Sequence, residues 1–128
     1  MRWLVLILTG GLLIGCMADE IPVQKTYRKK GLVYRKGEAQ PFSGIVYGTS
    51  REGYRDELCF YKKRYVDGQL NGLTKFWYDN GKLESQEPYK NGKINGLVYR
   101  YRKDGRRRCV MHLVDGRRGG SAGEYFFR

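Results

Sequence analysis

The sequence YVDGQLNGLTKFWYDNG at residues 65–81 recurs twenty-four residues later as YKNGKINGLVYRYRKDG at residues 89–105. The glycines of these two copies belong to a longer series, in which spacings of 4, 9 and 11 residues repeat. The series is Gly68, Gly72, Gly81, Gly92, Gly96, Gly105, Gly116 and Gly120. A fixed period of this length is typical of a repeat protein, in which each unit is one supersecondary element.

The residues that precede these glycines indicate what each unit is. Seven of the eight glycines follow Asp or Asn, as in Asp67-Gly68 and Asn91-Gly92. Such dipeptides tolerate the positive φ angles of tight hairpin turns, and here they alternate with short runs rich in aromatic and β-branched residues. The pattern predicts that each unit is a β-hairpin whose glycines mark turns.

The strands expected between the turns form two series. The first strand of each unit is expected at residues 45–47, 73–78, 97–102 and 121–126, and the second at 54–65, 82–87 and 106–113. The earliest unit is degenerate, because the glycine spacing before Gly68 is irregular. The prediction is therefore an all-β chain, with a repetitive, single-layer meander of antiparallel hairpins over residues 31–128.

Alternation along these strands predicts two different faces, because neighbouring side chains of a strand point to opposite sides of the sheet. One face is expected to be apolar and shared along the sheet, and it would carry Leu73, Leu97 and Tyr99, with Trp77, Tyr101 and Tyr125 as an aromatic ladder. The opposite face is expected to be wet and would carry Phe76, Tyr78, Arg100 and Arg102. On that wet face the two aromatics would either cover the N-terminal segment or dock a partner.

The same residues carry a resemblance to a known family. The Asp-Gly-x-x-Asn-Gly pair, the Tyr/Trp-rich strand and the following Asn-Gly-Lys-Leu of residues 67–83 resemble the bacterial variant of the MORN repeat, named for membrane occupation and recognition nexus. The resemblance covers residues 31–128 and is weakest in the first unit. It implies a single-layer antiparallel meander that lengthens by one hairpin per repeat.

The N-terminus has the pattern of an export signal. Residues 1–15 hold one cation, Arg2, then an apolar run and then small residues. The run is shorter than the roughly 20 residues of a membrane-spanning helix. Residues 13–16, LIGC, resemble the lipobox of bacterial lipoproteins, which implies cleavage before Cys16 and attachment of lipid to its thiol. The alternative is a secreted protein with an incidental cysteine.

Lipidation at Cys16 would make the chain an anchored protein of the bacterial cell envelope. Met17 stands where an aspartate would favour the inner membrane, so the outer membrane is favoured if the organism is Gram-negative. Residues 16–30 lack a clear strand pattern, contain Pro22 and end in three cations, residues 28–30. They are interpreted as a lipidated tether between membrane and domain.

Residue types that carry catalysis are scarce. His112 is the only histidine, which leaves little for a metal cluster or a Ser-His-Asp arrangement. Glu84 and Glu87 are expected on opposite faces of one strand, which excludes an acid/base pair. Cys59 and Cys109 are about two units apart, roughly 19 Å across the strands, whereas a disulfide needs Cα atoms ~4.4–6.8 Å apart. The prediction is a protein that is not an enzyme, has no cofactor or metal, and keeps these two cysteines as thiols.

Charge indicates the class of partner. The formal net charge is +12, and the cations are clustered, which is typical of surfaces that bind polyanions. Export makes nucleic acid a poor partner and leaves anionic lipid headgroups, lipopolysaccharide or an acidic protein; the plain alternative is a solvated rim that keeps a thin sheet soluble. The candidate binding residues are Phe76, Trp77, Tyr78, Tyr101, Arg100, Arg102, Arg106, Arg107 and Arg108.

Two functions fit these features. The first is an envelope-anchored lipoprotein whose repeats form a non-catalytic binding or scaffolding surface for a protein or an anionic envelope component. The second is an antitoxin or immunity-type protein, because bacterial proteins with similar repeats carry an antitoxin label and a basic chain would suit an acidic toxin. The fold does not choose between them, because function resides in sites placed on it.

Overall fold

The structure is a computed structural model that describes residues 18–51, 58–118 and 125–126. Its strands are β1 (Glu20–Pro22), β2 (Thr26–Lys29), β3 (Leu32–Arg35), β4 (Gly44–Ser50), β5 (Cys59–Val66), β6 (Gln69–Trp77), β7 (Leu83–Lys90), β8 (Lys93–Ile94), β9 (Gly96–Tyr101), β10 (Arg107–Val114), β11 (Arg117–Arg118) and β12 (Tyr125–Phe126). A 3-10 turn, η1 (Val23–Lys25), joins β1 to β2. No α-helix occurs in the described ranges, which confirms the predicted all-β class.

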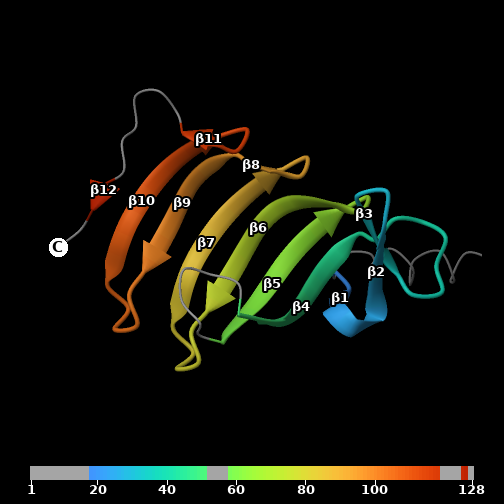
Figure 1. The fold of residues 1–128 in the computed structure, drawn as a ribbon, viewed down its shortest axis with the longest axis horizontal. Helices are drawn as coiled ribbons and strands as arrows, with labels where there is room; N and C mark the ends of the chain where they lie inside the picture. Colours follow the sequence, from blue (N-terminus) through green and yellow to red (C-terminus); the bar gives the residue numbers. More distant parts are fainter. Residues whose placement is uncertain (1–17, 52–57, 119–124, 127–128) are drawn as a thin grey trace, which may run out of the picture.

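The strands of the main sheet lie side by side in nearly their order along the chain. The sheet order is β1-β4-β5-β6-β7-β9-β10-β11, with β8 paired to β7 and β12 to β10, while β2 and β3 form a separate hairpin. From β4 to β10 each strand pairs antiparallel with the next, and β1 joins β4 in parallel. Figure 1 shows a curved sheet with the β2–β3 hairpin beyond β4 at one end and β10 and β12 at the other.

The first turn of each hairpin repeats with the period of the sequence. It is formed by the dipeptides Asp67-Gly68, Asn91-Gly92 and Asp115-Gly116, which have φ between 49° and 83° at both residues. Positive φ at both central residues is the geometry of a type I′ turn, and it matches the twist of the flanking strands. The predicted hairpin turns are confirmed at these three places.

The second glycine is not a turn in the two described pairs, Gly68/Gly72 and Gly92/Gly96, contrary to the prediction. Gly72 lies inside β6 and Gly96 begins β9. Both have positive φ, 105° and 126°. A Cβ at Gly72 would lie 2.7 Å from Arg64 Cδ, and one at Gly96 would lie 3.0 Å from Pro88 Cγ. These glycines are thus required because a side chain of the adjacent strand packs closely against the backbone.

The turns at the other end of the hairpins bond to one another. The backbone N–H of Lys82 donates to Asn80 Oδ1, and that of Arg106 donates to Asp104 Oδ1, both at 2.9 Å. The amide of Asn80 also donates to the carbonyl of Lys103 in the neighbouring turn, at 2.9 Å. The side chain of Asn80 therefore closes its own turn and also binds the neighbouring turn.

The N-terminal residues belong to the folded domain, which corrects the tether predicted over residues 16–30. β1 pairs with β4, and Ile21 is 8% exposed. Ile21, Val33 and Phe42 pack with Val46 of β4 and Tyr65 of β5 in one hydrophobic cluster. The prediction failed because three residues of parallel pairing leave little alternation to recognise. Residues 16 and 17, and the signal segment 1–15, lie outside the described residues.

The two faces of the main sheet are covered unequally. We call inner the face that carries Val46, Tyr65 and Thr74, and outer the face that carries Tyr47, Phe60 and Leu73. On the inner face Thr74 is 2% exposed and Val98 1%. Neighbouring Leu73 and Leu97, on the outer face, are 43% and 46% exposed. The face predicted to be the buried apolar side is therefore the exposed one, and the face predicted to be wet is the better packed.

This inversion has a physical cause. Alternation separates two sets of side chains but does not say which set another element covers. At the β4–β5 end of the inner face the cover comes from residues 18–43, whose apolar side chains pack beside Val46 and Tyr65. Because residues 16–30 were predicted to be a tether, no element was predicted to pack on this end of the inner face.

The assignment of the two faces can be tested by comparing alanine replacements of Val98, on the inner face, and of its neighbour Leu97, on the outer face. Because Val98 is 1% and Leu97 46% exposed, V98A should lower the free energy of unfolding by about 2 kcal/mol, and L97A by less than about 0.5 kcal/mol. Urea unfolding followed by tyrosine and tryptophan fluorescence measures both. A larger loss in L97A would contradict the assignment.

Candidate binding face

The outer face is defined by the register of the strands, since residues directly opposite in paired strands share a face. One row crosses the sheet through Tyr47, Lys62, Lys75, Gln86, Tyr99 and Val110. A second row places Phe60 opposite Trp77, and Trp77 opposite Leu83. Tyr101 lies opposite Arg107 on the same face. Trp77 and Tyr101 thus share one face, as predicted, while the side chain of Tyr125 lies outside the described part of the structure.

Large apolar side chains are exposed on this face. Phe60 is 47% exposed, Leu97 46%, Leu73 43% and Tyr47 41%. They come from four strands, β5, β9, β6 and β4, and the register places them among the half-buried Trp77 and its neighbours. Exposed apolar side chains that gather on one face of a soluble domain mark a site of interaction.

Positive charge accompanies the apolar side chains of the outer face. The cations placed there by register are Lys62, Arg64, Lys75, Lys90 and Arg107. Arg107 Cζ lies 5.4 Å from the centre of the Tyr99 ring, in a cation–π contact. Strands β4 to β10 place no Asp or Glu on this face in their described residues, but Glu20 of β1 lies there and pairs with Lys62 at 3.1 Å. The outer face is therefore apolar and cationic at once.

Three of the predicted binding residues lie on the inner face. Tyr78 is 2% exposed, and its hydroxyl donates to the carbonyl of Tyr101 at 2.7 Å, so it is a packing residue and not a docking residue. Phe76 is half-buried, with its ring centroid 6.1 Å from that of Tyr61. Arg100 is half-buried opposite Ser85 and Cys109. The prediction placed these side chains in a binding site because it took their face to be wet.

The remaining predicted cations lie at the turn between β9 and β10. Arg102, Arg106, Arg107 and Arg108 are all exposed. Arg106 Nε lies 3.4 Å from Asp104 Oδ2, although the side chain of Arg106 stays 78% exposed. Such an exposed pair contributes little to stability. The turn thus adds positive charge at one rim of the outer face, next to Tyr101.

The sequence prediction missed Tyr47, Phe60 and Lys62, which come from the degenerate first unit. A signal was present, since Tyr47 alternates with Val46 and Gly48, and Phe60 and Lys62 alternate with Cys59, Tyr61 and Lys63. The long interval between Gly53 and Gly68 hid this alternation, because no turn fixed where the strand began.

Carboxylates and thiols gather on the inner face. The register of β6 and β7 shifts between Phe76 and Trp77, which leaves Glu84 as the extra residue of a β-bulge. The thiol of Cys59 donates to Glu84 Oε2 at 2.6 Å. Glu87 belongs to the same face, so the expectation of opposite faces for Glu84 and Glu87 is wrong. Cys59 and Cys109 are both buried thiols, as predicted.

Two tyrosines of the inner face, buried Tyr65 and half-buried Tyr89, have perturbed pKa values. Burial raises the pKa of Tyr65, with a smaller opposing effect from the charge of Arg28. Burial also raises the pKa of Tyr89, whose hydroxyl donates to Glu87 Oε2 at 3.1 Å, and the negative charge of Glu87 raises it further. Both shifts favour the neutral phenol in the folded state.

The raised pKa values predict a loss of stability in alkali. An unfolded tyrosine loses its proton near pH 10. Because the folded pKa is higher, the stability due to the protonated phenols is fully present below about pH 10 and declines as the pH rises towards the folded value. Y89F should therefore show a shallower decline than the wild type in urea midpoints measured on both sides of pH 10. Y47F, on the exposed face, is the control, and an unchanged decline in Y89F would contradict the assignment.

Comparison of the chain with protein-family models, with curated proteins and with solved structures gave no match. Within the described residues, no group of three or more His, Cys, Asp or Glu side chains could hold a metal ion. In the same part of the chain, no helix is long and apolar enough to cross a membrane. What the outer face binds must be inferred from its own side chains.

Proposed function

We propose that the chain is a bacterial envelope lipoprotein, anchored through Cys16, whose MORN-like repeats act as a non-catalytic binding or scaffolding surface. The surface is the outer face, and its partner is an acidic protein or another anionic envelope component. One observation supports this most directly: exposed Phe60, Leu73 and Leu97 lie among cations on a face where the described strands β4 to β10 place no carboxylate.

The chemistry of this face favours an acidic protein. Burying exposed apolar side chains stabilises a complex by roughly 25 cal/mol per Å². Cations such as Lys62 and Lys75 speed the encounter with a negatively charged partner and disfavour basic partners. A second copy of the chain would bring like charges together, which opposes pairing of two outer faces. A partner with apolar groups inside an acidic rim satisfies both requirements.

An antitoxin or immunity-type protein is the alternative, and the same observation favours it. A toxin with an acidic surface would be held by the outer face in the same way. Co-expression of the chain with a toxin from a neighbouring gene separates the two functions, since an antitoxin restores growth and a scaffolding lipoprotein does not.

Replacement of the lipidated cysteine tests the anchor. C16S should remove the acyl chains and shift the protein from the membrane fraction to the soluble fraction, because the chain would lose its covalent attachment to lipid. Fractionation and the mass of the N-terminal peptide measure the change. C59S, which also removes one thiol, serves as the control and should stay in the membrane fraction. A wild-type protein whose N-terminal peptide carries no acyl mass would remove the anchor.

Charge reversal on the outer face tests the binding surface. K62E/K75E should lower capture of an acidic partner from solubilised envelopes by on the order of tenfold or more, because Lys75 becomes repulsive and the pair of Lys62 with Glu20 becomes two like charges on the same face. K29E/K30E carries the same change of charge on the β2–β3 hairpin and should capture the partner normally. Both variants must unfold at similar urea concentrations. Equal capture by K62E/K75E and the wild type would show that the partner binds elsewhere.

A further inference from the structure

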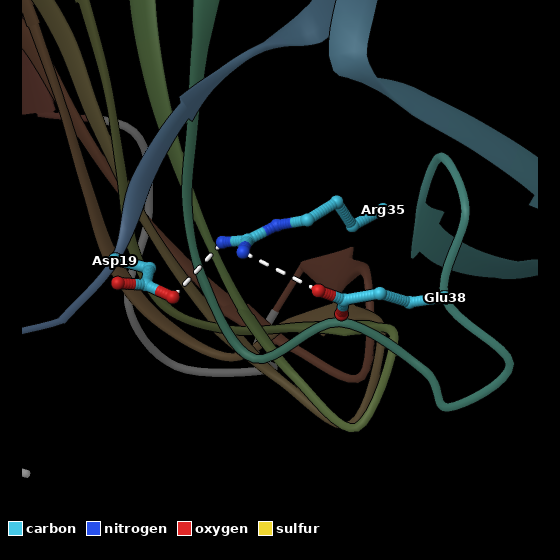
Figure 2. A network of polar contacts seen from close by, with 3 residues as sticks. All are labelled: Asp19, Arg35 and Glu38. Carbon is cyan, nitrogen blue, oxygen red and sulfur yellow. Dashed lines mark hydrogen bonds and ion pairs between the residues drawn. The ribbon is translucent and has the colours of Figure 1, made fainter.

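The β2–β3 hairpin carries a second basic surface, separate from the outer face. Its exposed cations are Lys25, Arg28, Lys29, Lys30 and Lys36, which we call the basic hairpin. Among the described residues, the carboxylates of this end of the molecule, Asp19, Glu20 and Glu38, are engaged by other side chains. Figure 2 shows the guanidinium of Arg35 between Asp19 and Glu38, at 2.9 and 3.4 Å, and Glu20 pairs with Lys62 at 3.1 Å. The five cations therefore keep their charge for a partner.

The basic hairpin is held firmly against the main sheet. The rings of Tyr27 and Tyr34 stack across the two strands, with centroids 5.2 Å apart. The backbone N–H of Val33 donates to the carbonyl of Gly68 at 3.0 Å, and that of Phe42 donates to the carbonyl of Val33 at 2.8 Å. Val33 is 3% exposed within the hydrophobic cluster. The cations thus have a fixed position relative to β4 and β1.

The lipidation site lies close to this hairpin along the chain. Asp19 is three residues after Cys16, and three extended residues span at most about 11 Å. Asp19 is itself fixed, because its carbonyl accepts the N–H of Ile45 at 2.7 Å and its carboxylate binds Arg35 at the end of β3. A lipid on Cys16 would therefore keep Asp19, and with it the end of β3, close to the bilayer surface. The separation would be at most about 11 Å of main chain plus the length of the lipidated side chain.

We propose that the basic hairpin binds the anionic phospholipid headgroups of the membrane that holds the anchor. This rests on the lipid anchor of the proposed function. Each Lys or Arg near an anionic surface strengthens the attraction by about fivefold, and the attraction acts over a screening length of ~8 Å at physiological salt. Tyr27, 38% exposed, places an amphipathic ring on the same hairpin. The β1–β4 end of the sheet then rests on the bilayer, and strands from β5 onward extend away from it.

Lysine labelling tests this contact on the full chain as the cell matures it. The purified lipoprotein is reconstituted into vesicles of phosphatidylglycerol with phosphatidylcholine, or of phosphatidylcholine alone, and treated with an amine-reactive reagent at ~0.15 M salt. Labelling of Lys29 and Lys30, read by mass spectrometry, should fall about fivefold or more in the anionic vesicles. It should recover at about 1 M salt, where charges are screened beyond ~3 Å. Lys90 and Lys93, at a corresponding turn, should label equally in both.

Two variants that remove the same charge at different places distinguish a contact made by the basic hairpin from an effect of the total charge of the chain. K29Q/K30Q should restore labelling of Lys25 and Lys36 in anionic vesicles, whereas K90Q/K93Q should leave them protected. The mass of the N-terminal peptide reports acylation in the same experiment. An acylated chain whose Lys29 and Lys30 label equally in both vesicles overturns the hairpin contact alone, and an acidic protein then becomes the partner of these cations. A chain without acyl mass overturns both the anchor and the contact.

Discussion

Packing of the N-terminal residues onto one face of the sheet is the constraint on which the rest of the structure depends. A sheet must bury an apolar face against another element, and a single layer of hairpins supplies none of its own. Ile21, Val33 and Phe42 provide that element, since they cluster with Val46 and Tyr65. Backbone hydrogen bonds from Val33 to Gly68 and from Phe42 to Val33 hold this cover in place. Because this cover lies on the inner face of β4 and β5, alternation leaves Tyr47 and Phe60, on the outer face of the same strands, exposed.

The part of the fold that could be predicted is the part set by local chemistry. Asp67-Gly68 and Asn91-Gly92 take positive φ wherever they occur between strands, so the period of the turns and the positions of most strands followed from glycine spacing alone. Which face is buried depends on contacts between segments far apart in the chain, and no spacing encodes them. Tyr78 illustrates the limit: its equivalent in the next unit is Arg102, which suggested a wet face, yet Tyr78 is 2% exposed.

The candidate site was also predictable only where the repeat fixed the register of the strands. Trp77 and Tyr101 were placed on one face because residues twenty-four positions apart repeat their strand register. Phe60 and Lys62 were not, because the irregular first unit gives no register to extend. The cations at 106–108 looked like one cluster, but the pairing of β9 and β10 shifts between Arg107 and Cys109, and Arg107 lies over the ring of Tyr99 on the outer face. Consecutive charges in a strand do not share a face, so a charged run in sequence overstates the size of the surface patch.

The two basic surfaces differ in a way that bears on their partners. On the outer face, Lys62 and Lys75 lie among side chains such as Phe60 and Leu73 that gain from losing water, so a partner must exclude water to bind well. On the basic hairpin, the cations project around a small two-stranded sheet with Tyr27 as its exposed aromatic residue. Contacts of these cations with headgroups depend mainly on charge and weaken as salt screens it. The two surfaces therefore suit two different partners. A chain held at a bilayer by its basic hairpin would keep its outer face accessible to a protein.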